Sequence, residues 1–147
     1  MKGLLNGALA IVGGYVAGAV VNLILVVSGH QVVPLPEGMD VSSEEGMKET
    51  AHLLRGEHFI FPLVAHALGS LVGGFLAWRI AEKSRMVYAL AVGVLFLIGG
   101  ISMVMAFPSP GWFKVVDLGL AYLPMAALGG VIASRVFGSL SRGESLS

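Results

Sequence analysis

The stretch GGFLAWRI at residues 73–80 returns, with conservative changes, as GGVIASRV at residues 129–136. Each copy joins a glycine pair, two apolar residues, an alanine and an arginine in the same order. Glycine pairs let helix backbones approach closely in a membrane, and an arginine at the end of a span can extend its charged head into the lipid headgroups. The repeated stretch therefore predicts two membrane-spanning helices that end alike.

The composition around these stretches is that of a membrane protein. Of the 147 residues, 56% are hydrophobic and only 12% are charged, whereas soluble domains carry about 25% charged residues. The mean hydropathy is +0.86. Nine basic and nine acidic residues balance, so the net charge gives no argument for a nucleic-acid partner. We therefore expect the lipid bilayer to be the main surroundings of the chain.

Four apolar segments are long enough to cross a bilayer, which takes about 20 residues in a helix. They are residues 4–28, 59–78, 86–107 and 115–137. Each must pair its backbone polar groups internally in lipid, which favours helices. The sequence predicts an all-α membrane protein, a four-transmembrane-helix bundle in a single domain of residues 1–147.

The positions of lysine and arginine predict the orientation, because basic residues close to the spans stay on the cytoplasmic side. With both termini inside, six of the nine basic residues are cytoplasmic and three are external. The cytoplasmic set is Lys2, Arg79, Lys83, Arg85, Arg135 and Arg142, and the external set is Lys48, Arg55 and Lys114. The loop of residues 29–58 is then external.

Glycine pairs in all four spans indicate an internal repeat. The pair shifts by 56 residues from the second span to the fourth and by 86 from the first to the third, and the difference of 30 is about the length of the external loop. We therefore predict two tandem helical hairpins; chance similarity between glycine-rich spans is the alternative. The residues expected to pack helices together are Gly14, Gly18, Gly73, Gly74, Gly129 and Gly130.

The external loop contains the pattern of a short amphipathic helix. Ser42 and Glu45 have the spacing of a capping box, and Met47, Ala51 and Leu54 then repeat on one helical face. Such a helix can lie on the outer leaflet or across the mouth of the bundle. It is either a structural lid or a docking element for a partner or ligand.

Three polar residues within or beside the spans, Asn22, His66 and Asp117, are candidate functional groups, because polar groups in a membrane are energetically expensive. Together with Ser102 they are predicted to line a polar pocket that opens outward and serves a ligand or a pore. The alternative is that Asn22 and His66 only hydrogen-bond between helices, which contributes about 0.6 to 2 kcal/mol. Asp117 is expected at the membrane interface, paired with Lys114 or hydrated.

Motifs for catalysis or metal binding are not found in the sequence. It has no phosphate-binding glycine loop, no His-Glu-x-x-His and no Gly-x-Ser-x-Gly. His30, His52 and His58 share the external loop, but their spacing is not that of a zinc site. Without cysteine there is no thiolate chemistry either. We predict that the chain is not an enzyme and uses no cofactor or metal.

Four short stretches, HQVVPLPEGMD, GGFLAWRIA, PSPGWF and YLPMAALGG, begin at residues 30, 73, 108 and 122. On these stretches the chain resembles a group of small bacterial four-span integral membrane proteins. The resemblance covers most of the chain. It implies four helices in the bacterial cytoplasmic (inner) membrane and carries no catalytic residues.

The function predicted from the sequence is that of a small structural or accessory membrane protein. It is expected to act through helix association, in a homo-oligomer or a larger membrane complex. The alternative is a small channel or transporter with an outward-facing polar vestibule formed by the candidate residues above.

Overall fold

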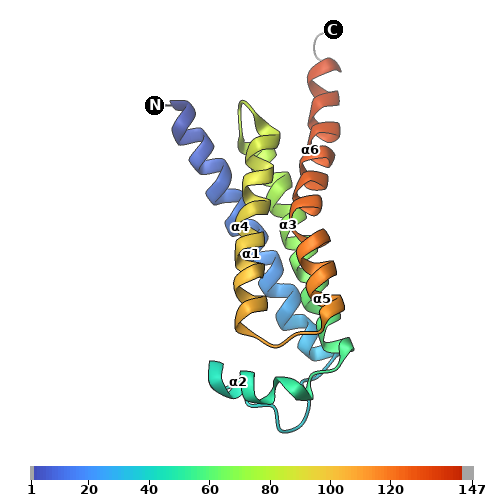
Figure 1. Cartoon of the computed structure of the whole chain (residues 1–147). Helices are drawn as coiled ribbons and strands as arrows, with labels where there is room; N and C mark the ends of the chain where they lie inside the picture. The colour runs from blue at the N-terminus through green and yellow to red at the C-terminus, as the bar shows by residue number, and fades with distance from the viewer. Residues whose placement is uncertain (1, 144–147) are drawn as a thin grey trace.

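The computed structural model describes residues 2–143, which are helical and contain no strand. Four long helical segments run along one another (Figure 1). They are α1 (Lys2–Val32), α3 (Ile60–Ile80), α4 (Arg85–Ala106) and a fourth segment formed by α5 (Gly111–Val116), a π-helical turn (Asp117–Ala121) and α6 (Leu123–Gly143). All four are long and apolar enough to span a membrane. The predicted all-α architecture with four candidate membrane spans is confirmed.

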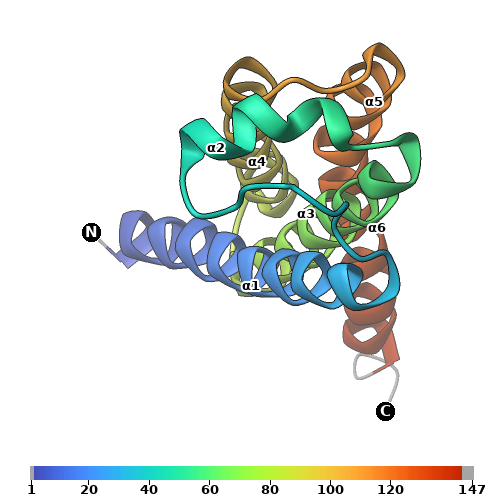
Figure 2. The same ribbon diagram turned by 90° about the horizontal axis from the view of Figure 1, so that it is seen from below.

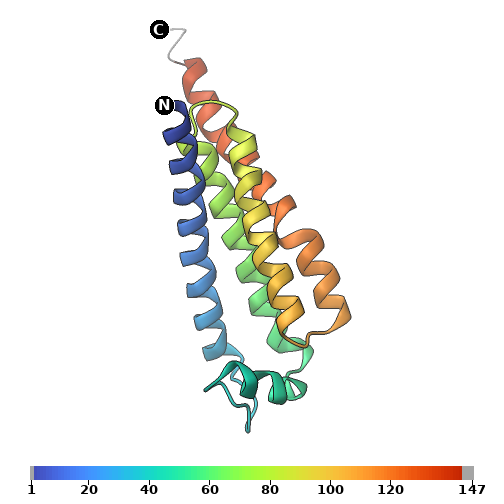
Figure 3. The same cartoon turned by 60° about the vertical axis from the view of Figure 1, so that its left-hand side comes forward.

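A separate segment, residues 33–59, covers one end of the bundle, and the start of α1 and the end of α6 lie toward the other end (Figures 1 and 3). We call it the cap segment. It contains α2 (Glu44–Thr50) and two 3₁₀ turns, Ala51–Leu53 and Gly56–Phe59. The N-cap of α2 is Ser43, whose hydroxyl accepts from the Gly46 N–H at 3.0 Å, rather than the predicted Ser42. Figure 2 shows α2 lying across the end of α4.

The interior of the bundle is built from small residues, and the large apolar side chains face outward. Apart from Val92, the most deeply buried apolar residues are alanines, among them Ala10, Ala65, Ala77, Ala89, Ala121, Ala126 and Ala133. In contrast, Leu23 is 62% exposed and Val87 is 63% exposed. A water-soluble bundle buries such side chains, whereas lipid solvates them as well as a protein core does. The distribution is that of helices which pack closely and present their large side chains to hydrocarbon.

Helix α3 lies at the centre of the bundle, in contact with α1, α4 and α6. Two glycines of α1 allow the first of these contacts. A Cβ on Gly14 would lie 2.6 Å from the Gly73 carbonyl oxygen, and one on Gly18 would collide with the carbonyl oxygen of Gly69. Any side chain at these positions would separate α1 from α3, so the glycines set how closely the two backbones approach.

The two copies of the repeated stretch meet in the interface between α3 and α6. A Cβ on Gly74 would collide with the backbone of Ala126, and a Cβ on Gly129 would collide with the carbonyl oxygen of Leu71. Gly130 faces α4 instead, against Met86 and Ala89. The six glycines that the sequence singled out therefore pack helices of the same chain against one another.

The end of the bundle opposite the cap segment is held by an amide side chain. Asn6 of α1 donates from Nδ2 to the Ile80 carbonyl at 3.1 Å and accepts at Oδ1 from the Glu82 N–H at 3.0 Å. These bonds satisfy backbone groups at the C-terminus of α3, where the helical ladder has ended. Ser84 then takes a left-handed conformation, with φ of 48°, to start α4.

We predict that Gly129→Ala destabilises the protein although alanine is the better helix former. The new methyl group would collide with the Leu71 carbonyl oxygen, and overpacking of this kind costs about 1–3 kcal/mol. The matched control is Gly99→Ala, because a Cβ on Gly99 meets nothing within 4 Å. The control should leave stability unchanged or raise it by up to about 1 kcal/mol. Unfolding in detergent, followed by circular dichroism, measures both; equal effects would refute the packing argument.

Candidate functional site

Three polar side chains from α3, the π-helical turn and the start of α6 form a cluster near the cap end of the bundle. His66 Nδ1 lies 2.7 Å from Asp117 Oδ1, and the Tyr122 hydroxyl donates to Asp117 Oδ2 at 2.7 Å. The hydroxyl also lies 2.9 Å from His66 Nδ1, and the two rings stack with centroids 5.6 Å apart. We call these residues the polar triad.

The π-helical turn is what brings Asp117 and Tyr122 onto the same side of the fourth span. Pro124 has no N–H to bond to the carbonyl four residues earlier, so a regular α-helix is interrupted there. In a π-helix, residues five apart lie about one turn from each other, and such turns are frequent at functional sites. Asp117 and Tyr122 are five residues apart, so the carboxylate and the phenol meet.

A glycine on α4 makes room for the phenol ring. A Cβ on Gly100 would collide with the ring and hydroxyl of Tyr122. The second glycine of the Gly99-Gly100 pair therefore accommodates an aromatic side chain from another span. Since Tyr122 is 2% exposed, its hydroxyl depends on Asp117 and His66 for hydrogen bonds.

The charge of the polar triad follows from its burial. Asp117 is 1% exposed and His66 is 22% exposed, and an isolated charge in apolar surroundings is strongly unfavourable. A net-neutral Asp117–His66 pair avoids that cost. This pair carries two protons. One is shared between Asp117 Oδ1 and His66 Nδ1, and the other is bound to His66 Nε2; this holds both for a carboxylate with an imidazolium and for a carboxylic acid with a neutral imidazole. His66 therefore keeps an N–H at Nε2 that the cluster does not use.

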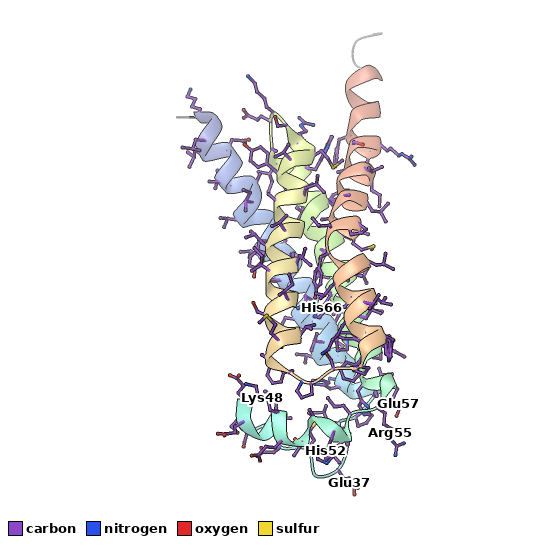
Figure 4. The ribbon with its side chains drawn as sticks, viewed as in Figure 1. Glu37, Lys48, His52, Arg55, Glu57 and His66 are labelled. Carbon is purple, nitrogen blue, oxygen red and sulfur yellow. The ribbon has the colours of Figure 1, made fainter. Side chains whose placement is uncertain are left out.

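A cavity of about 500 Å³ lies between the polar triad and the cap segment. Its inner end is lined by Asn22, His66, Gly100 and Asp117, and its sides are mainly apolar residues of α1, α3, α4 and the cap. The predicted helical stripe of Met47, Ala51 and Leu54 also lines it. In Figure 4, His66 lies within the bundle, whereas Glu37, Arg55 and Glu57 lie on the cap segment and point away from it.

The amide of Asn22 is the second polar group at the inner end of the cavity. Its Oδ1 is buried and has no hydrogen-bond partner among the described residues. Gly69 of α3 packs against it, since a Cβ there would lie 3.1 Å from Asn22 Cβ. His66 is three residues before Gly69, and residues at that spacing are neighbours on one helix face. The amide and the imidazole therefore lie close together at the same end of the cavity.

Of the four candidate residues, the structure brings Asn22, His66 and Asp117 to the same cavity and leaves Ser102 out of it. Ser102 is exposed and its hydroxyl donates to the Ile98 carbonyl at 2.9 Å. The expectation that Asp117 is hydrated or paired with Lys114 is wrong, because the π-helical turn directs its carboxylate inward to His66 and Tyr122. Tyr122 was not identified as a candidate, although it lies 56 residues after His66, which is the spacing of the repeated glycine pairs.

Two of the three loop histidines, His52 and His58, are engaged with nearby backbone, whereas His30 lies in the last turn of α1 and lines the cavity. His52 Nδ1 lies 2.8 Å from the Glu49 carbonyl oxygen, and His58 Nδ1 accepts from the Arg55 N–H at 3.0 Å. Within residues 2–143, no group of three histidine, aspartate or glutamate side chains is arranged to hold a metal ion.

A scan against protein-family models, a search of curated proteins and a search of solved structures each returned no match. The resemblance to small bacterial four-span membrane proteins thus stays a prediction. The site has to be interpreted from its own geometry.

We predict strong thermodynamic coupling between His66 and Asp117. His66→Leu leaves a buried carboxylate with only Tyr122 as a partner, which should cost about 3 kcal/mol of stability. Asp117→Leu removes the carboxylate that both groups bond to and leaves His66 and Tyr122 with only each other as partners, 2.9 Å apart, which should cost about 1–3 kcal/mol. The double variant removes both polar groups, so its loss should be at least about 1 kcal/mol smaller than the sum.

Detergent-solubilised protein unfolded with increasing SDS and followed by circular dichroism measures these differences. Ser102→Ala is the control, because Ser102 lies on the exposed side of α4, and it should change stability by no more than about 0.5 kcal/mol. Additive losses in the double variant would show that the two side chains do not interact.

Proposed function

We propose that this chain is a four-span protein of a bacterial cytoplasmic membrane that receives a small molecule in an outward-facing vestibule, in the manner of a small transporter. The observation that carries the proposal is the cavity of about 500 Å³ with His66 and Asn22 at its inner end. Ligand cavities typically measure about 300–1,000 Å³, with mostly apolar walls and few polar groups. Buried ionisable residues in a membrane most often serve ligands or ions.

The orientation rests on the basic residues. With the termini in the cytoplasm, six of nine lysines and arginines are inside, and the cap segment with its amphipathic α2 is external. Glu37, Arg55 and Glu57 of the cap segment point away from the bundle in Figure 4, as expected for a surface in water. The cavity then lies on the external side, beneath the cap segment.

The inner half of the bundle supports a gated vestibule rather than an open pore. Among the described residues, the cavity lining does not extend on α1 before Asn22, on α3 beyond His66 or on α4 before Gly100. Beyond that level the helices are held together by the glycine contacts of Gly14 and Gly73. Passage through the protein would require those contacts to open, as in alternating access.

The tandem-hairpin hypothesis receives support from positions 56 residues apart. Ala65 and Ala121 are both buried, as are Ala77 and Ala133. His66 and Tyr122 are related by the same spacing and contact each other. A parallel repeat with an axis near the membrane normal would bring such equivalent positions together between α3 and α6.

A purely structural or accessory role in an oligomer is the other function under consideration. Its sequence basis was glycine-mediated helix association, but the six predicted packing glycines contact helices of their own chain. They therefore give no argument for association between chains. The transporter-like function is supported by a defined cavity with named polar residues at its inner end, whereas no such feature of the described residues supports the role in an oligomer.

The absence of cysteine from the sequence allows a direct test with single-cysteine variants in intact cells. We predict that Asn22→Cys reacts with a small membrane-impermeant methanethiosulfonate added outside, because Asn22 lines the cavity. Glu37→Cys on the cap segment should react fully, and Lys83→Cys at the opposite end should react only after the membrane is opened.

Each outcome bears on a different part of the proposal. Labelling of Lys83→Cys from outside, or failure of Glu37→Cys to react, would overturn the orientation. Labelling of Glu37→Cys without labelling of Asn22→Cys would overturn the outward-facing vestibule.

A further inference from the structure

We infer that the vestibule binds a neutral amphiphile, a molecule with an apolar body and a hydroxyl head. This inference rests on the proposed function and names the ligand class of the same site. Three properties of the cavity carry it: the charge of its lining, the hydrogen-bonding groups at its inner end and the apolar character of its walls.

The lining favours a ligand without net charge. As far as the structure describes the chain, no lysine or arginine lines the cavity, and the further imidazoles in the lining, His30 and His58, belong to the end of α1 and to the cap segment. An anionic head at the inner end would therefore find no permanently charged cationic partner. The acidic group in the lining is Asp117, which is 1% exposed and already paired with His66 and Tyr122. A cationic head would have to break that pair to reach the carboxylate. Moving a charged ligand head, whether anionic or cationic, from water into the cavity would cost desolvation free energy that this lining does not offset.

The polar groups at the inner end match one hydroxyl. In the net-neutral triad, His66 keeps Nε2–H as a donor. Asn22, which lines the same cavity, has a buried Oδ1 without a partner among the described residues, and a rotation of the amide would turn it toward a ligand. A hydroxyl can accept a hydrogen bond and donate one at the same time. It can therefore satisfy both groups, whereas an ether or a ketone can accept from His66 but cannot donate to Asn22.

The walls suit the apolar body of such a molecule. They include Val26 of α1, Phe61 of α3, Val104 of α4 and, from the cap segment, Met39 and Leu54. Methionine side chains adapt to ligands of varied shape. The cavity thus combines one polar end with a long apolar wall, which is the shape of an amphiphile.

Fluorescence quenching in lipid nanodiscs tests this inference on the intact protein. Trp112 contacts Phe113, a residue of the cavity lining, with ring centroids 5.9 Å apart. Trp78 lies in the cluster with Ala89 and Ala133, away from the cavity. The variant Trp78→Phe keeps only Trp112 and therefore reports quenching near the cavity. The variant Trp112→Phe keeps only Trp78 and reports quenching by probe dissolved in the lipid. The probe is 12-bromododecan-1-ol, and 1-bromododecane is the matched probe without a hydroxyl.

The expected result is saturable quenching of Trp112 by the bromoalcohol, which unlabelled dodecan-1-ol reverses, and only unsaturable quenching of Trp78. Asn22→Leu should weaken the binding about five-fold, the effect of about one hydrogen bond, and Ser102→Ala should leave it unchanged. Competition with dodecan-1-ol and with 4-nonylphenol distinguishes an alkyl from an aryl alcohol, and saturable displacement by either one supports the ligand class.

Other results would overturn the inference. These are equal quenching by the two bromo compounds, no effect of Asn22→Leu, or stronger displacement by dodecanoate or dodecyltrimethylammonium than by dodecan-1-ol. If Asn22→Cys is labelled from outside while no alcohol binds, the vestibule stands and only the ligand class fails.

Discussion

The arrangement of the cap end of this bundle depends on one buried carboxylate. Asp117 lies among apolar helices at 1% exposure, where an unpaired carboxylate is strongly unfavourable. It is stabilised by His66 from α3 and Tyr122 from the start of α6. These bonds fix α3 against the fourth span and orient the imidazole, whose other nitrogen is left for the cavity. The same pairing that stabilises the buried carboxylate therefore orients the hydrogen-bonding group on which the proposed ligand binding depends.

The rest of the bundle provides a rigid support for this site. Because glycines and alanines lie where α3 meets α1 and α6, the backbones of these helices approach closely below the cavity. Toward the cap segment the contacts change from glycines to larger residues such as Phe61 and Val104, and there the cavity opens. Close packing at one end and a cavity at the other is the arrangement on which the proposed outward-facing vestibule rests.

The sequence predicts the helices well and the site in part. Long apolar segments allow few structures in lipid, so four spans could be read directly, and glycine spacing indicated which faces pack. Asn22, His66 and Asp117 stood out because polar groups are rare in such spans. Their geometry could not be predicted, because it depends on the π-helical turn before Pro124, which turns Asp117 inward. The sequence does not distinguish Tyr122 from an ordinary tyrosine near a membrane interface, where tyrosine is common. Only its contact with His66 shows that it belongs to the site.

The most direct test of the central claim is nitrogen-15 NMR of the His66 imidazole in lipid bilayers, assigned by the signals that disappear in His66→Gln. We expect a proton on Nε2 and an Nδ1 signal that shifts in Asp117→Asn, because Nδ1 is bonded to the carboxylate at 2.7 Å. An Nε2 without a proton, or an Nδ1 signal unaffected by Asp117→Asn, would contradict this pairing.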